Sequence, residues 1–175
     1  MDKILIVGSG TPVGSKIVRF LRDRQKTVYG ADRIEQDNGN KASKFFKMDL
    51  KNKDAMRFLF EFTDIEVVIF CGQHLSDRAT YTVIDYNYQI YLTMMTYLSE
   101  KHVNNLIVVS NYGKDNPQTP TEVSWYAINL LTGIFTKAFN LNTLLITPKD
   151  NLYKNIKQFL GVESEESKEK GEEGN

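Results

Sequence analysis

The segment Ile4–Gly14, which reads ILIVGSGTPVG, decides the fold of this chain. Its first four residues form a continuous apolar run, as expected of a strand buried on both faces of a parallel sheet. Glycines follow where that strand ends. Pro12 suits the first turn of a helix, because its missing N–H would be unpaired there anyway. The segment therefore predicts a strand, a glycine-rich turn and a helix.

The same alternation continues along the chain. Five more strands are predicted at residues 28–31, 45–48, 67–71, 106–109 and 143–146. Helical spacing predicts helices over residues 12–24, 80–101, 121–139 and 152–160, and another after Asn52. This order predicts an α/β fold, with a doubly wound, Rossmann-type parallel sheet of about six strands between two layers of helices.

Length and composition predict one folded domain followed by a tail. The chain has 175 residues, of which 41% are hydrophobic and 25% are charged. We expect residues 1–162 to form a single domain. Residues 163–175 hold six glutamates, two lysines and no large apolar side chain. Such a segment is expected to be an acidic disordered tail.

Bulk properties also argue against several classes of function. The formal net charge is zero, which gives no support to nucleic-acid binding. No apolar run approaches the roughly 18 residues of a membrane span, and the N-terminus leaves no room for a signal peptide. Cys71 is the single cysteine, so no internal disulfide and no metal site are expected. These features predict a cytoplasmic protein.

The glycine-rich turn has the residues of a phosphate-binding loop. Glycines let the backbone approach a pyrophosphate, and a helix N-terminus offers free N–H groups and a positive dipole end. The predicted cofactor-binding residues here are Gly8, Gly10, Thr11, Pro12, Val13 and Gly14; a tight turn without a ligand is the alternative. In the spacing Gly8-x-x-Thr11-x-x-Gly14, Thr11 takes the place of a middle glycine. Its Cβ narrows the approach, while its hydroxyl could donate a hydrogen bond. We expect Gly14→Val to abolish dinucleotide binding in a folded domain.

Acidic residues follow the second and third strands. Asp32 lies 18 residues after Gly14, where a carboxylate accepts hydrogen bonds from the adenosine ribose and repels a 2′-phosphate, which favours NAD. Arg33 could instead pair with a 2′-phosphate, so NADP stays an alternative. Asp49 is expected either to contact adenine or to cap the next helix.

These pieces together resemble the extended short-chain dehydrogenase/reductase family, of the nucleotide-sugar epimerase and dehydratase type. The resemblance covers residues 1–153 through seven segments: Ile4–Ser15, Val28–Arg33, Met48–Leu50, Asp64–Gly72, Tyr86–Tyr88, Val108–Gly113 and Trp125–Leu130. It implies an NAD(P)-binding domain in which Asp49 and Leu50 contact adenine and Cys71 and Gly72 line the cofactor. It also implies a sugar-nucleotide or small carbonyl substrate, with Ser110 and Tyr126 as catalytic residues.

Two departures from the family bear on catalysis. The family has a lysine four residues after its catalytic tyrosine, but Leu130 stands at that place after Tyr126. Leucine can neither bind a ribose nor lower the pKa of a phenol. Only about 25 residues follow Pro148, too few for the family's substrate lobe. The chain is therefore predicted to bind NAD(P) with weak or no redox catalysis, as a regulatory or partner module. An active oxidoreductase or epimerase that uses Tyr126 without the lysine is the alternative.

The long helix over residues 80–101 is rich in tyrosine and methionine, including Tyr88, Tyr91, Met94, Met95 and Tyr97. Some of these side chains must pack on the sheet. Those left over would form a homodimer face, since interfaces favour tyrosine and methionine. Core packing alone is the alternative.

Overall fold

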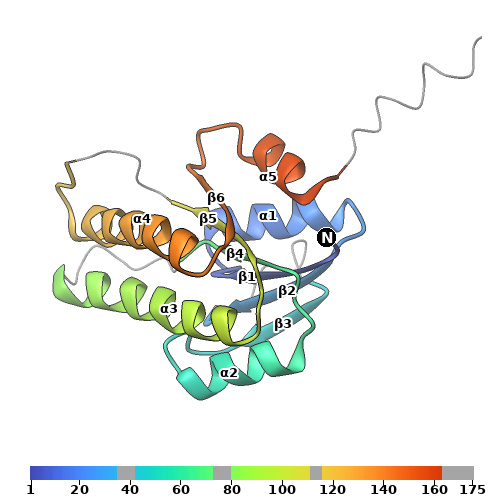
Figure 1. Cartoon of the computed structure of the whole chain (residues 1–175), viewed down its shortest axis with the longest axis horizontal. Coiled ribbons are helices and arrows are strands. Elements are labelled where there is room, and N and C mark those ends of the chain that lie inside the picture. The colour runs from blue at the N-terminus through green and yellow to red at the C-terminus, as the bar shows by residue number, and fades with distance from the viewer. Residues whose placement is uncertain (35–41, 73–79, 111–115, 163–175) are drawn as a thin grey trace, which may run out of the picture.

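The computed structural model describes residues 1–34, 42–72, 80–110 and 116–162. Figure 1 shows a central sheet with helices on both faces. The strands are β1 (Lys3–Val7), β2 (Thr27–Asp32), β3 (Lys44–Lys47), β4 (Val67–Phe70), β5 (Asn105–Val109) and β6 (Asn142–Ile146). The helices are α1 (Pro12–Arg22), α2 (Lys53–Phe62), α3 (Thr80–Glu100), α4 (Pro120–Ala138) and α5 (Leu152–Leu160). Every predicted element is present, with small shifts at the ends.

All six strands are parallel and follow the order β3-β2-β1-β4-β5-β6. β1 lies at the centre, where Ile6 pairs with Gly30 of β2 on one side and Ile69 of β4 on the other. The direction of winding reverses between β1 and β4. This confirms the doubly wound, Rossmann-type fold, and open sheets of this kind bind ligands at such a switch point.

Two apolar cores lie on opposite faces of the sheet. Alternate strand residues point to opposite faces, so Leu5 and Val7 enter one core while Ile4 and Ile6 enter the other. α2, α3 and α4 cover the first core, and α1 and α5 cover the second (Figure 1). Because both faces are covered, the strands read as unbroken apolar runs in the sequence.

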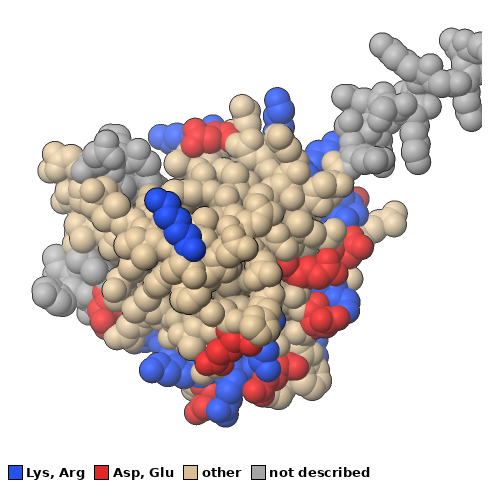
Figure 2. Space-filling model, viewed as in Figure 1, with Lys and Arg blue, Asp and Glu red and all other residues tan. Residues whose placement is uncertain are grey.

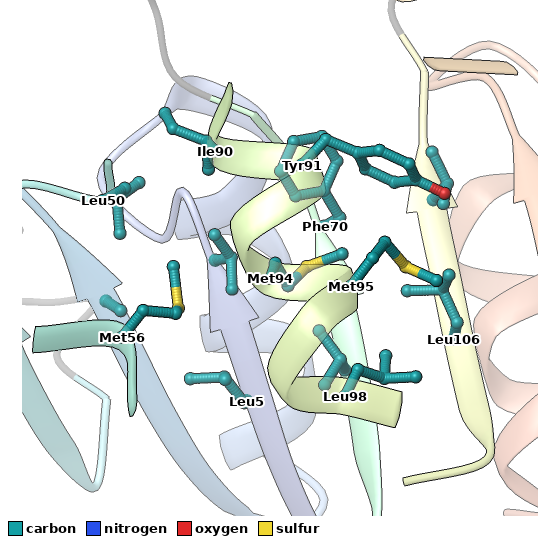
Figure 3. Close-up of a cluster of buried hydrophobic side chains, with 14 of the residues drawn as sticks. Leu5, Leu50, Met56, Phe70, Ile90, Tyr91, Met94, Met95, Leu98 and Leu106 are labelled. Atoms are coloured by element: carbon teal, nitrogen blue, oxygen red, sulfur yellow. The ribbon is translucent and has the colours of Figure 1, made fainter. Parts of the chain in front are cut away.

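The middle of α3 packs directly on the sheet. In Figure 3, Tyr91, Met94 and Met95 point from α3 towards strand residues that include Phe70 and Leu106. These three side chains are buried, and the Tyr91 ring meets the Phe70 ring edge-on at 5.2 Å. The side chains that suggested a homodimer face on this helix are therefore mostly core residues. The homodimer itself stays a prediction.

Helix starts follow their capping residues. Thr11 caps α1 with Pro12 as the first helical residue, and Asn52 caps α2 as predicted by accepting a hydrogen bond from the amide of Ala55. α4 begins with a capping box, in which Thr119 and Glu122 bond to each other's backbone amides. Each cap fixes where a helix begins relative to the strand before it.

The surface carries charges of both signs. On the face shown in Figure 2, acidic and basic side chains are interspersed over α2, and no continuous patch of one sign is visible. Within the described ranges, no helix combines the length and apolar character that crossing a bilayer requires. The expected acidic tail lies outside the described residues.

One buried hydrogen bond joins α3 to α4. The Tyr91 hydroxyl lies 2.7 Å from Thr132 Oγ1, and that threonine already donates its proton to the carbonyl of Ile128. Tyr91 is therefore the donor. We expect Tyr91→Phe to lower the free energy of unfolding by about 1 kcal/mol, because one buried hydrogen bond is lost while Thr132 keeps its other partner. Urea denaturation measures this, with Tyr153→Phe on the surface as the control. Equal stability of Tyr91→Phe and the wild type would contradict the assignment.

Candidate functional site

The candidate site lies at the carboxyl ends of β1 and β4. Gly8 begins the turn after β1 with φ +87°, and Gly72 follows β4 with φ +67°. A Cβ built on Gly8 would overlap the carbonyl group of Gly72, so the two backbones touch with no room for a side chain between them. Glycine is needed at Gly8 both for this contact and for its positive φ.

Backbone hydrogen bonds tie the glycine loop to β2. The amides of Gly8 and Ser9 donate to the carbonyl of Ala31 at 2.9 and 3.4 Å. The amide of Gly10 donates to Asp32 Oδ2 at 2.9 Å. The loop is thus held against the strand that carries the expected ribose-binding acid.

The Thr11 hydroxyl makes two hydrogen bonds within the turn. It donates to the carbonyl of Gly8 at 2.7 Å and accepts from the amide of Gly14 at 3.0 Å. The expectation that this hydroxyl could donate to a ligand needs correction, since its one proton is already used by Gly8. The sequence showed that Thr11 replaces a glycine, but it did not show which bonds the hydroxyl makes.

Asp32 is enclosed by backbone amides. Asp32 is only 1% exposed. Its Oδ1 accepts hydrogen bonds from the backbone amides of Arg33 at 2.6 Å and Ile34 at 3.4 Å. Burial raises the pKa of this carboxyl, and the hydrogen bonds from the amides of Gly10, Arg33 and Ile34 oppose that effect. Asp32 therefore shapes the loop, and its expected contact with a ribose stays a prediction.

A polar cluster lies beside Asp32, at the expected adenosine end. The Tyr86 hydroxyl donates to Asp49 Oδ1 at 2.6 Å, which together with its other partners lowers the pKa of Asp49. Burial and this bond raise the pKa of Tyr86 to about 12. Arg33 also bonds to the Tyr86 hydroxyl, and the Lys51 ammonium lies 4.3 Å from the ring centroid. Two cations and a carboxylate are thus fixed around one phenol.

The structure excludes one of the two expected roles of Asp49, and its contact with adenine stays a prediction. The cap of α2 is Asn52, so a capping role for the Asp49 side chain is wrong. Leu50, next to it, is fully buried in the core. Sequence reasoning missed Tyr86 as a partner of Asp49, since 37 residues separate them. The only available signal was that Tyr86 opens a segment matched to the family.

The opposite end of the site holds the predicted nicotinamide-side residues. A Cβ on Gly72 would lie 2.7 Å from the Trp125 ring and 3.7 Å from Asn87 Oδ1, so both side chains border this turn. The Cys71 side chain is buried in the core on the α1 face, and burial raises the pKa of its thiol. Only the backbone of Cys71 is placed to line a ligand.

The two expected catalytic residues follow β5. Ser110 is 1% exposed, and its amide donates to the carbonyl of Ile146 at 2.8 Å. Tyr126 lies in the first half of α4, partly buried against the core. Leu130 comes one helical turn later and is 55% exposed. Part of the family-like segment after Ser110, residues 111–113, lies outside the described residues.

No group of three or more histidine, cysteine, aspartate or glutamate side chains is arranged as metal ligands among the residues that the structure places.

Comparison with known proteins identifies relatives of this arrangement. The profile of the NAD dependent epimerase/dehydratase family matches residues 4–129, well over half of the chain. No curated protein matches the chain. Among solved structures, a UDP-glucose 4-epimerase superposes with a TM-score of 0.74 at 23% identity, covering 83% of this chain and 51% of that one.

Two further structures are similar at the level of the fold. The UDP-glucose 4-epimerase of Thermus thermophilus, solved as a complex with NAD, gives a TM-score of 0.69 at 18% identity, over 82% of this chain and 53% of that chain. The L-threonine dehydrogenase of Clostridium difficile gives 0.71 at 19% identity, over 84% and 53%. The chain spans about half the length of these proteins.

Gly14 gives a test of the loop geometry. A Cβ there would overlap the carbonyl oxygen of Gly8 and lie 2.9 Å from Thr11 Oγ1, so the expectation that Gly14→Val leaves a folded domain needs correction. We now expect even Gly14→Ala to lower the free energy of unfolding by about 2 kcal/mol, because a backbone atom cannot move aside. The matched control is Gly133→Ala in α4, where a Cβ meets nothing and removal of a helical glycine stabilises by up to about 1 kcal/mol. Thermal denaturation of both variants measures the effects. Equal melting temperatures would contradict the loop geometry.

Proposed function

Since the chain belongs to the NAD-dependent epimerase/dehydratase family, we propose that it binds NAD and catalyses little or no hydride transfer. It then acts as a regulatory or partner module. The observation that carries the proposal is the pair Tyr126 and Leu130, in which a leucine 55% exposed stands one turn after the tyrosine.

The described residues fit an extended dinucleotide. Asp32 would hold the adenosine ribose, the backbone beside Asp49 would face adenine, and the loop at residues 8–14 would face the pyrophosphate. The loop lies directly against the expected ribose-binding residue, because a Cβ on Gly10 would lie 2.8 Å from the carbonyl oxygen of Ile34 and 3.1 Å from the Asp32 carboxylate. NAD, when bound, supplies a nicotinamide ring that accepts and returns hydride.

The missing cation limits the chemistry of Tyr126. A phenol acts as a base near neutral pH when a nearby positive charge lowers its pKa, commonly by one to three units. Leu130 supplies no charge. The only basic residue in α4 is Lys137, close to the end of the helix and about three turns after Tyr126. The helix therefore offers the phenol no substitute for the lysine on the turn that follows it.

The proposal for the substrate names only its chemical class. We propose that any substrate is a sugar nucleotide or a small carbonyl compound, since UDP-glucose 4-epimerases and threonine dehydrogenases share the fold. Three apolar side chains, Val123, Leu130 and Ile134, are exposed along α4. They lie on the helix that carries Tyr126, so apolar surface is available on that helix for a substrate.

Cofactor choice gives the first test. Arg33 already interacts with Tyr86 and Asp49, and the Asp32 carboxylate repels the negative charge of a 2′-phosphate. We therefore expect NAD⁺ to bind at least tenfold more tightly than NADP⁺. Isothermal titration of both dinucleotides measures this. Arg33→Ala should leave the preference in place. Tighter binding of NADP⁺ that is lost in Arg33→Ala would show that Arg33, not Asp32, selects the cofactor.

Catalysis gives the second test. We expect no NADH oxidation above background by the wild type over a panel of keto-sugars and small carbonyl compounds. Leu130→Lys should strengthen NAD⁺ binding, because an ammonium one turn after Tyr126 can reach the nicotinamide ribose. Turnover by the wild type that disappears in Tyr126→Phe would establish the alternative, an active oxidoreductase or epimerase that works without the lysine.

A further inference from the structure

We infer that Thr11 and Pro12 lower the affinity of this site for a pyrophosphate. They leave one unpaired backbone amide in the first turn of α1, where a helix N-terminus normally offers three. The inference rests on the proposed binding of NAD and names the two residues that regulate it. Thr11 then competes with the ligand for the backbone amide of Gly14.

The first three amides of an α-helix have no partner within the helix and are available to an anion. In α1 these positions are Pro12, Val13 and Gly14. Pro12 has no N–H to offer. The amide of Gly14 already donates to Thr11 Oγ1 at 3.0 Å. Among the described residues, only the amide of Val13 is left without an acceptor in this turn.

The amides before the helix are also in use. Those of Gly8 and Ser9 donate to Ala31, that of Gly10 donates to Asp32, and that of Thr11 donates to the carbonyl of Gly8 at 3.1 Å. A phosphate group that approaches the turn therefore meets backbone donors that already have internal partners.

Thr11 is fixed in the competing position. The residue is 7% exposed, and its hydroxyl proton goes to the carbonyl of Gly8 at 2.7 Å, which turns an oxygen lone pair towards the amide of Gly14. A phosphate oxygen is the stronger acceptor because its hydrogen bonds are charge-assisted. Binding nevertheless exchanges one hydrogen bond for another instead of adding one, so the net gain is small.

Replacement of Thr11 tests the competition. Thr11→Ala removes the hydroxyl and frees the amide of Gly14, so NAD⁺ should bind about tenfold more tightly, the value of one hydrogen bond to a charged group. The same variant loses a helix cap, so its melting temperature should fall by about 2 to 4 °C. Thr11→Ser keeps the hydroxyl and should match the wild type in both measurements. A purely structural role would weaken stability and binding together.

Adenosine separates the pyrophosphate from the rest of the site. It carries no phosphate, so Thr11→Ala should leave its dissociation constant unchanged while that of NAD⁺ falls. Pro12→Ala restores the amide at the first helical position and should also tighten NAD⁺ without changing adenosine binding. All dissociation constants can be measured by isothermal titration on the full chain.

The outcomes separate this inference from the proposed function. Measurable NAD⁺ binding by the wild type that is unchanged in Thr11→Ala and Pro12→Ala would overturn the inference and leave the proposed function standing. No NAD⁺ binding by the wild type or either variant would overturn the proposed function, and this inference with it. Binding that appears only in Thr11→Ala or Pro12→Ala would support the inference.

Discussion

The contact between the backbones of Gly8 and Gly72 is the constraint on which the rest of the site depends. It brings the ends of β1 and β4 together at the point where the sheet reverses its winding. A side chain on Gly8 would force the strands apart, and one on Gly72 would collide with the Trp125 ring. The loop after β1 and the start of α4 are thereby both placed against Gly72, although more than a hundred residues separate them.

Most of the fold could be predicted because its strands are buried on both faces. β1 and β4 read as unbroken apolar runs, and helical spacing with Asn52 as a cap located α2. The core-facing role of Tyr91 could not be decided from the sequence. Helical periodicity assigns faces well only where charged residues mark the outside, and the charged residues of α3 are Asp85 and Glu100 alone. Its aromatic and methionine side chains therefore suggested an interface where the structure has core.

The candidate site was predictable in position but not in its hydrogen bonds. Glycine spacing located the loop, and Asp32 lies against it as expected, because the strand-turn-helix context is visible in the sequence. The Tyr86–Asp49 pair joins helix α3 to the connection between β3 and α2, so only the folded chain reveals it. The bonds of Thr11 depend on a side-chain rotamer, and a sequence position does not specify whether a hydroxyl faces a ligand or its own backbone.

The internal hydrogen bonds of the loop link stability to ligand affinity. A glycine at position 11 would leave the helix N-terminus open to a phosphate but uncapped when no ligand is bound, whereas Thr11 caps it at all times. The enclosure of Asp32 works in the same direction, since three amides satisfy its carboxylate before any ribose arrives. Leu130 adds an apolar side chain where a catalytic cation would stand. The bonds of Thr11 and Asp32 favour a loop that is stable before any ligand binds, and rapid hydride transfer would gain from the opposite of all three features. These features agree with the proposal that the chain keeps a stable dinucleotide fold while it catalyses little or no hydride transfer.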